Sequence, residues 1–157
     1  MVVKEVKSNA DKDLFLGMVE SIYTDDPNYI RPLDKDIESV FSNNDNYFER
    51  TGNSTRYLLF KNDLDSKPIG RIAVFFNEKL SESHEQPTGG VGFFECINDQ
   101  EAANTLFDTS MEWLQKWGAE AMDGPINFGE KDKFWGLLVD GFLPPTYLMN
   151  YNPPYYK

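Results

Sequence analysis

Cysteine and histidine are almost absent from this sequence of 157 residues, which has one of each, Cys96 and His84. A single cysteine excludes an internal disulfide framework and is typical of a reducing compartment. Structural zinc sites usually need four ligands, most of them cysteine or histidine. No second histidine or neighbouring cysteine completes such a set here, so the sequence predicts no resident metal ion.

Positive charge is also scarce. Lysine and arginine number 15 against 26 aspartate and glutamate residues, which gives a formal net charge of −11. A field of that sign repels phosphate backbones and anionic lipid surfaces, so we expect neither nucleic acid nor a membrane as a partner. No apolar run approaches the length of a membrane span, and the N-terminus lacks the apolar core of a signal peptide. The expected location is cytoplasmic.

Apolar and aromatic residues are plentiful enough for one packed core. They make up 40% and 15% of the chain, respectively, which argues against global disorder. The length fits one ordinary domain. No internal repeat or linker divides the sequence, so we expect a single domain over residues 1–157, possibly the N-terminal part of a longer protein.

The clearest local signal is a helix between residues 98 and 118. Asn98 is a capping residue, and Glu101 follows it at capping-box spacing. Gly118 is expected to close the helix in the left-handed conformation. The buried stripe of this helix recurs at three- and four-residue intervals and consists of Ala103, Leu106, Phe107, Ser110, Met111, Leu114 and Trp117.

A predicted strand lies on each side of this helix, at residues 91–97 and 121–128. A strand, a crossover helix and a second strand form a βαβ unit, whose two strands are parallel neighbours. We expect the rest of the chain to be built onto this unit.

The remaining elements follow from periodicity and turn residues. Strands are expected over residues 2–7, 55–61, 68–76, 89–97, 121–128 and 147–149. Helices are expected between a Ser8 cap and Pro27, and over residues 34–41, 98–117 and 132–139. Because residues 68–76 are apolar on both faces near their end, this strand should be central. The predicted fold class is α/β (α+β), a mixed sheet in the order β-α-α-β-β-β-α-β-α-β.

This order resembles the GNAT (GCN5-related N-acetyltransferase) fold, and the resemblance spans nearly the whole chain. The phrases PIGRIAVFFN, GFFECINDQEAANTLFD, GPINFGEKDKFWGLLVDGF and NYNPPYY resemble an uncharacterised bacterial group of GNAT-like proteins. A GNAT sheet normally ends in a two-stranded hairpin, and this chain offers one strand at most. The last strand of the fold is therefore expected to be missing. A homodimer partner, or a missing C-terminal half, would then cover the sheet edge.

The resemblance implies a small-molecule cofactor, acetyl-CoA or another acyl-CoA, in a V-shaped opening between the two parallel strands. In GNAT enzymes the pantetheine arm pairs with the first of these strands, and the pyrophosphate binds the amides at the start of the following helix. By this resemblance the cofactor-binding residues are Phe94, Cys96, Ile97, Gln100, Ala103 and Asn127.

The resemblance also implies a base and an acid. Glu95 lies on the strand where GNAT enzymes often keep a general base, and a carboxyl group inside an apolar strand has a raised pKa unless it is paired. The alternative for Glu95 is a structural ion pair with Arg71 on the neighbouring strand. Amide and phenol side chains gather near the C-terminus: Tyr147, Asn150, Tyr151, Tyr155 and Tyr156. The phenol of Tyr147 is the expected acid for the leaving thiolate. The alternative for these aromatic residues beside prolines is a docking or interface surface.

Four further side chains are expected to contact the substrate: Arg71, Glu130, Trp135 and Asn150. Glu130 and Asn127 follow the carboxyl end of the second parallel strand, where ligand crevices open in α/β sheets. Structural roles are equally open for this loop: Asn127 as a turn residue, Glu130 as a helix cap and Trp135 as a core residue.

The sequence departs from the GNAT pattern at the pyrophosphate loop. The family usually has Gln/Arg-x-x-Gly-x-Gly/Ala, whereas residues 98–103 read NDQEAA. Asp99 and Glu101 place negative charge where phosphates would bind. Two functions stay open: an N-acyltransferase domain that uses an acyl-CoA-type donor and an unknown amine, and a non-catalytic GNAT-like module that acts through assembly or small-ligand binding.

Overall fold

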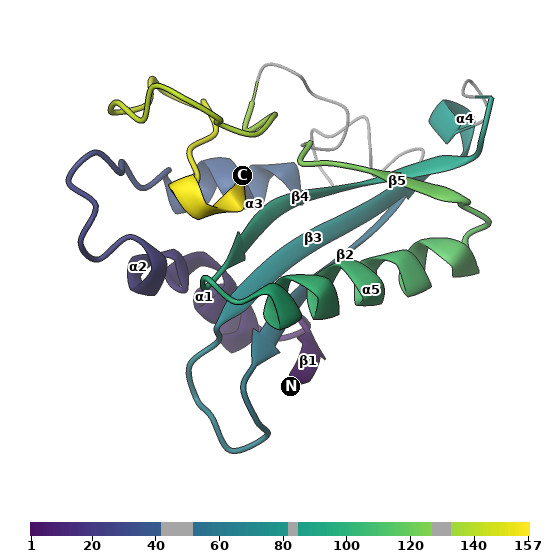
Figure 1. Ribbon diagram of the computed structural model, residues 1–157. Helices are drawn as coiled ribbons and strands as arrows, with labels where there is room; N and C mark the ends of the chain where they lie inside the picture. Colours follow the sequence, from purple (N-terminus) through teal and green to yellow (C-terminus); the bar gives the residue numbers. More distant parts are fainter. Residues whose placement is uncertain (42–51, 82–84, 127–132) are drawn as a thin grey trace.

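The structure, a computed structural model, describes residues 1–41, 52–81, 85–126 and 133–157. Its centre is a five-stranded mixed sheet in the order β1-β2-β3-β4-β5 (Figure 1). The strands are β1 (Val2–Glu5), β2 (Gly52–Phe60), β3 (Gly70–Asn77), β4 (Thr88–Cys96) and β5 (Ala121–Asp123). Strands β1 to β4 pair antiparallel and β5 joins β4 in parallel. The predicted α/β (α+β) class with a mixed sheet is therefore confirmed, as is the parallel pair.

Helices cover both faces of this sheet. Helix α5 (Gln100–Lys116) crosses one face, and α1 (Asn9–Gly17), α2 (Val19–Ile22) and α3 (Asp34–Val40) lie on the other (Figure 1). Two short helices complete the described part: α4 (Glu78–Ser81) after β3, and the 3₁₀ helix η1 (Pro154–Tyr156) at the end of the chain.

Strand β3 is the centre of the core, as its apolar run predicts. Every one of its residues is buried. Successive side chains of a strand point to opposite faces of the sheet, so β3 contributes to two clusters. Ile72, Val74 and Phe76 pack on the α5 side, and Ala73 and Phe75 pack on the α1 and α3 side.

The helix caps are partly as predicted. Ser8 caps α1 and forms a capping box with Asp11. Gly118 has φ +88° and follows α5 in the left-handed conformation, as expected. The cap of α5 is Asp99, one residue after the predicted Asn98. Its extended backbone places its carboxylate on the N–H groups of Glu101 and Ala102.

The first helical segment was predicted as one continuous helix, and this prediction was wrong. The segment is interrupted at Met18 and ends at Ile22, four residues before the expected end at Asp26. At the interruption the N–H of Ser21 donates to the carbonyl of Met18, an i to i+3 bond that tightens the turn.

The predictions for the C-terminal third were wrong in three places. Strand β5 stops at Asp123 instead of running to residue 128, and residues 133–139 form no helix. Residues 147–149 form no strand. Positive φ angles at Phe134 (+48°), Gly136 (+90°) and Leu148 (+64°) interrupt regular structure there. Residues 127–132 lie outside the described part of the chain.

Candidate functional site

Within the described residues, strands β4 and β5 are paired at one end only. The described ladder joins Thr88, Gly89 and Gly90 to Ala121, Met122 and Asp123. Glycines bring the backbones close here: a Cβ on Gly90 would lie 2.3 Å from Cζ of Phe75, and one on Gly124 would lie 2.9 Å from the carbonyl oxygen of Val91. One more contact follows: the N–H of Ile126 donates to the carbonyl of Val91 at 2.8 Å. Beyond this contact, β4 continues to Cys96 beside a cavity.

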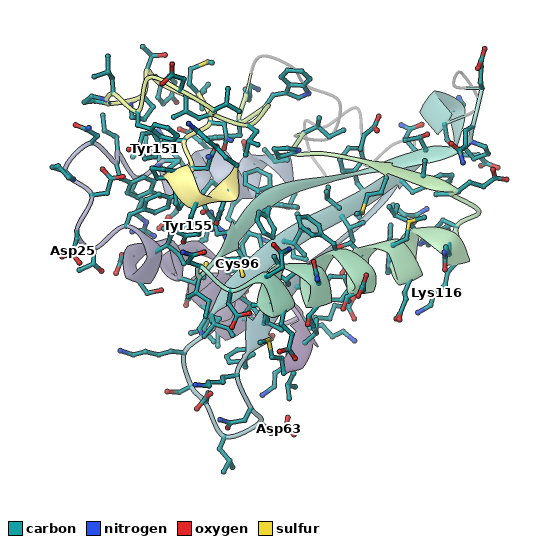
Figure 2. All side chains as sticks on the ribbon, viewed as in Figure 1. Asp25, Asp63, Cys96, Lys116, Tyr151 and Tyr155 are labelled. Carbon is teal, nitrogen blue, oxygen red and sulfur yellow. The ribbon has the colours of Figure 1, made fainter. Side chains whose placement is uncertain are left out.

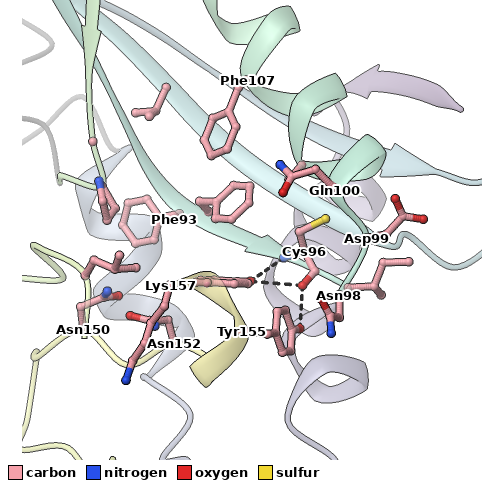
Figure 3. A pocket seen from close by; sticks show the side chains of 18 of the residues that line it. Phe93, Cys96, Asn98, Asp99, Gln100, Phe107, Asn150, Asn152, Tyr155 and Lys157 are labelled. Carbon is pink, nitrogen blue, oxygen red and sulfur yellow. Dashed lines mark hydrogen bonds between the residues drawn. The ribbon is translucent and has the colours of Figure 1, made fainter. Parts of the chain in front are cut away.

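This cavity, which we name the β4 cleft, has a volume of about 320 Å³ (Figure 3). Such a volume is at the lower end of the range for small-molecule sites. Its walls come from β4, from the first two turns of α5, from the segment that follows β5 and from the C-terminal residues. Phe94 stacks on Phe107 across it, with 4.7 Å between the ring centroids.

The β4 cleft brings together most of the expected cofactor-binding residues. Phe94, Cys96, Ile97, Gln100 and Ala103 all line it. Asn127, the sixth expected residue, lies outside the described residues.

Two tyrosines from η1 occupy the edge of β4 inside the cleft. The N–H of Cys96 donates to the hydroxyl of Tyr156 at 2.6 Å. The hydroxyl of Tyr155 donates to the carbonyl of Cys96 at 2.8 Å (Figure 3). Figure 2 shows where Cys96 and Tyr155 lie in the fold. A ligand that pairs with the carbonyl of Cys96 has to displace Tyr155, and one that pairs with the N–H of Cys96 has to displace Tyr156. The sequence placed both tyrosines in the C-terminal phenol cluster but gave neither of them a specific role in the site. The sequence signal for them is PPYY: the two prolines restrict the backbone, and the two tyrosines that follow carry hydroxyl groups that need hydrogen-bond partners when buried.

The amides at the start of α5 also have a partner. Asp99 accepts from the N–H of Glu101 at 2.9 Å and from the N–H of Ala102 at 3.1 Å, and Asp99 itself lines the cleft. These are amides of the type that hold a pyrophosphate in the GNAT fold.

Glu95 lies on the opposite face of β4, in a second and smaller cavity of about 40 Å³. We name this cavity the Arg71–Glu95 pocket after its two charged residues. Both are buried, with 4% of Arg71 and 7% of Glu95 exposed. Helix α3, the segment around Tyr29 and residues 149–151 form the other walls.

The predicted contact between Glu95 and Arg71 is present. The two residues are register partners on β4 and β3. Nη2 of Arg71 lies 3.9 Å from Oε1 of Glu95, which is an ion-pair distance but too long for a hydrogen bond. Oε2 of Glu95 accepts from the hydroxyls of Tyr23 at 2.9 Å and Tyr156 at 3.2 Å.

Burial dominates the electrostatics of this pair. It raises the pKa of Glu95 to about 7, although Arg71 and the hydroxyls of Tyr23 and Tyr156 act in the opposite direction. Burial also lowers the pKa of Arg71, which Glu95 partly offsets. The two interpretations of Glu95, an ion-pair member and a base, are thus compatible, since the loose pair leaves the carboxyl group able to titrate near neutral pH.

Tyr156 connects the two cavities. Its ring lines the β4 cleft, and its hydroxyl contacts Glu95 on the other side of the strand. Burial raises the pKa of the Tyr156 phenol, as does the Glu95 carboxylate, so the phenol keeps its proton. The cavities also share Phe93, Phe94, Phe134 and Asn150 in their walls.

The remaining predicted residues have different placements. Asn150 lines both cavities, and its amide donates to the carbonyl of Gly136. Trp135 and Tyr147 line neither cavity and are 43% and 70% exposed. The hydroxyl of Tyr147 donates to Asp36 at 2.7 Å, so the structure places this expected acid away from the site. Glu130 lies outside the described residues.

Two kinds of feature are absent from the described residues. No three histidine, cysteine, aspartate or glutamate side chains within them converge as a metal-holding group would. No helix in these parts of the chain combines the length and the apolar character that crossing a bilayer requires.

No family model matches the sequence. Two curated relatives align with nearly all of it. Protein YghO of Escherichia coli is 26% identical over 99% of this chain, and a "Bacterial ceramide synthase" of Caulobacter vibrioides is 28% identical over 96% of it. The alignments cover 39% and 38% of those two proteins, so this chain spans about two fifths of their length.

Proposed function

We propose that this chain is a GNAT-like N-acyltransferase domain, which moves an acyl group from a thioester to an amine. The observation that carries the proposal is the position of Glu95. This buried carboxyl group, with a pKa of about 7, lies in the smaller cavity and is hydrogen-bonded to a tyrosine that lines the larger one.

The β4 cleft is the proposed donor site. Its aromatic walls suit an apolar acyl chain and the pantetheine arm of acetyl-CoA or another acyl-CoA. The carbonyl of Cys96 is offered to the arm once Tyr155 turns aside, while Tyr156 keeps its contact with Glu95. The Asp99 carboxylate at the mouth opposes the pyrophosphate, so we expect the arm and acyl group to supply more affinity than the phosphates.

The Arg71–Glu95 pocket is the proposed acceptor site, from which an amine reaches the thioester beside Phe93 and Asn150. The amine nitrogen attacks the thioester carbon, so that an N–C bond forms and the C–S bond breaks. The proton that the nitrogen loses goes to the Glu95 carboxylate. At pH 7 about half of a carboxyl population with this pKa is ionised and able to accept it.

Tyr156 is the proposed acid that protonates the leaving thiolate. The thiolate leaves in the β4 cleft and needs one proton. The Tyr156 hydroxyl gives its proton to the thiolate while it receives the proton that Glu95 has taken. The products are an amide and a thiol, with no net uptake of protons. This role replaces the one expected for Tyr147.

The name of the Caulobacter relative denotes a reaction of the same class, since a ceramide carries an acyl group on the nitrogen of a long-chain amino alcohol. The proposal does not rest on that name. It rests on the geometry around Glu95.

One set of observations favours a second candidate, a non-catalytic module that binds a small ligand or assembles with another chain or a second copy. The amides at the start of α5 are held by Asp99, and the β4 edge is held by two phenols, so both groups that a GNAT cofactor uses already have internal partners. This candidate predicts weak or absent acyl-CoA binding.

Thiol release separates the two candidates. The wild-type chain, mixed with acetyl-CoA or a longer acyl-CoA and a set of primary amines, should release thiol only when an amine is present. Glu95→Gln should lower kcat/KM by about 10²- to 10⁴-fold. Glu112→Gln is the matched control, because Glu112 is exposed on α5 and lines neither cavity. The absence of saturable binding of every acyl-CoA at millimolar concentration would reject the enzyme.

A further inference from the structure

The hydroxyl of Tyr23 has one proton and two acceptors. It lies 2.9 Å from Oε2 of Glu95 and 3.2 Å from the carbonyl oxygen of Tyr151. Tyr23 is buried, with 6% of it exposed, and it lines neither cavity. A phenol has a single O–H donor, so Glu95 and Tyr151 compete for this proton.

The ring of Tyr23 is held in place by its neighbours. It stacks on Tyr29 with 3.7 Å between the ring centroids and 5° between the ring planes. It also packs with Val19 and Tyr151. The backbone N–H of Tyr23 donates to the carbonyl of Val19 at the end of α2. Removal of the hydroxyl alone should therefore leave the ring where it is.

The two acceptors suit the two protonation states of Glu95. The ionised carboxylate only accepts, so the proton of Tyr23 then lies toward Oε2. The neutral carboxyl group has an O–H of its own, which can donate to the oxygen of Tyr23. The proton of Tyr23 is then free for the carbonyl of Tyr151. Through this exchange Glu95 can gain or lose a proton without leaving its own donor or that of Tyr23 unpaired.

We propose that Tyr23 is a positioning residue for Glu95, whose hydroxyl holds the carboxylate and turns to the carbonyl of Tyr151 when the carboxyl group is protonated. The effect on catalysis rests on the proposed function, in which Glu95 accepts the proton of the amine. Burial raises the pKa of Glu95, and the hydroxyl of Tyr23 is among the groups that oppose this rise. The titratable and charged groups near Glu95 on the neighbouring elements are Arg71 on β3, Tyr23 after α2, Tyr29, and Tyr155 and Tyr156 on η1.

Tyr23→Phe removes the hydroxyl and keeps the ring. In a ¹³C titration of the Glu95 carboxyl group, the midpoint should rise by about one pH unit, because the ionised form loses a hydrogen bond. Relative to wild type, kcat/KM should fall about fivefold at pH 7 and stay within about 1.5-fold at pH 9, where Glu95 is ionised in both proteins.

Tyr29→Phe is the matched control for the carboxyl titration. It removes the hydroxyl of the stacked ring, and no hydrogen bond joins Tyr29 to Glu95, both of which lie in the described part of the chain. The midpoint of Glu95 in this variant should stay within about 0.3 pH unit of wild type.

The wild-type chain offers a second readout, which needs neither a variant nor turnover. The ¹³C signal of the Tyr151 carbonyl should shift with the same midpoint as the Glu95 carboxyl group, because the two accept the same proton in turn. The carbonyl of Leu138 is the control, since it accepts at 3.1 Å from the side-chain amide of Asn152, which does not titrate. Tyr23→Phe should remove the shift at Tyr151.

The outcomes separate this inference from the proposed function. A Glu95 midpoint that is the same in wild type and Tyr23→Phe would overturn the inference and leave N-acyl transfer standing. A loss of kcat/KM that is equal at pH 7 and pH 9 would also overturn it, since Tyr23 would then be structural only. If no amine is acylated, but the midpoint rises in the variant and the Tyr151 signal follows Glu95, the positioning role stands and the proposed reaction fails. If Tyr23→Phe does not fold, the wild-type titration decides: a Tyr151 signal that moves with Glu95 supports the inference, and one that stays in place overturns it.

Discussion

The two ends of β4 differ in what fills the space beside them. At residues 88–90 the neighbour is β5, and glycines let the backbones and the side chains of Phe75 and Leu114 approach closely. At residues 93–96 the neighbours are a cleft on one face and a small polar pocket on the other, with two phenols at the strand edge. One strand is thus packed tightly against its neighbours at its first end and bordered by cavities at its last.

The comparison shows how the fold accommodates a buried ionisable group. The paired end fixes the position and twist of β4, because its close contacts tolerate no added atoms. The open end can then hold Glu95 in a buried position without a close ionic partner, where its pKa rises. Substitutions at the first end should therefore act on stability, and substitutions at the last end should act on proton chemistry.

The largest expected effect is the contribution of Glu95 to the pH dependence of the free energy of unfolding. The pKa of Glu95 rises from its ordinary value of 4.5 to about 7, so between these values the folded chain holds a proton that the unfolded chain has released. Its contribution to the free energy of unfolding is therefore favourable at low pH and falls as pH rises through this window, by about 3 kcal/mol in total.

Urea unfolding at pH 5 and pH 8 measures this contribution. Glu95→Gln does not titrate, so its stability relative to wild type should increase between the two pH values. All other carboxyl groups are common to both variants and cancel in the difference. Parallel pH profiles for the two proteins would show that Glu95 has an ordinary pKa.

Tyr156→Phe removes the hydroxyl that connects Glu95 to the cleft and keeps the ring. We expect kcat to fall by about 100-fold, since general acid catalysis is lost. Tyr147→Phe is the matched control and should leave kcat unchanged, because the hydroxyl of this exposed residue contacts only the Asp36 carboxylate among the described residues. Equal effects of the two substitutions in steady-state assays would contradict the proton path.

Gly90→Ala tests the paired end. Its Cβ would lie 2.3 Å from Cζ of Phe75 and 2.8 Å from Cδ1 of Ile126, so the substitution should lower the free energy of unfolding by about 2 kcal/mol. Gly17→Ala, at the end of α1, meets no atom within 4 Å and should be neutral or slightly stabilising in the same urea titration. A stable Gly90→Ala chain would mean that the two strands are not held closely there.

Asp99→Ser should give the smallest effect. Serine keeps a capping oxygen for α5 but removes the negative charge at the mouth of the cleft, so acyl-CoA should bind about threefold more tightly at low salt and less so at high salt. Asp99→Ala, which loses the cap as well, should cost about 1 kcal/mol of stability. Calorimetric titration at two salt concentrations checks the first effect. Unchanged affinity would show that the phosphates do not approach Asp99.

The elements that could be predicted from sequence are those with strong local signals. The apolar run of β3 predicts a central strand, and the stripe of α5 together with its flanking strands predicts the parallel pair. Both follow from periodicity and from chain connectivity, which do not depend on distant contacts. The capping box of Ser8 and Asp11 is equally local.

The C-terminal third could not be predicted in this way. Residues 133–139 have apolar spacing that suits a helix, but positive φ angles at Phe134 and Gly136 serve tertiary contacts instead. The ring of Phe134 packs against Leu16 and Ile37, contacts that no local pattern contains. In the same way, the pairing of Tyr156 with Glu95 spans 61 positions in the sequence. Glu95 itself was recognisable because a carboxyl group in an apolar strand is unusual.

The most direct test of the open end is a titration of the ¹⁵N-labelled chain with a thioether analogue of acetyl-CoA, in which no acyl transfer can occur. Saturable shifts are expected at the backbone amides of Phe94 and Cys96, with little change at Gly89 and Gly90. Amide signals that do not respond at millimolar analogue, or that respond only at the paired end, would contradict the assignment of the β4 cleft as the donor site.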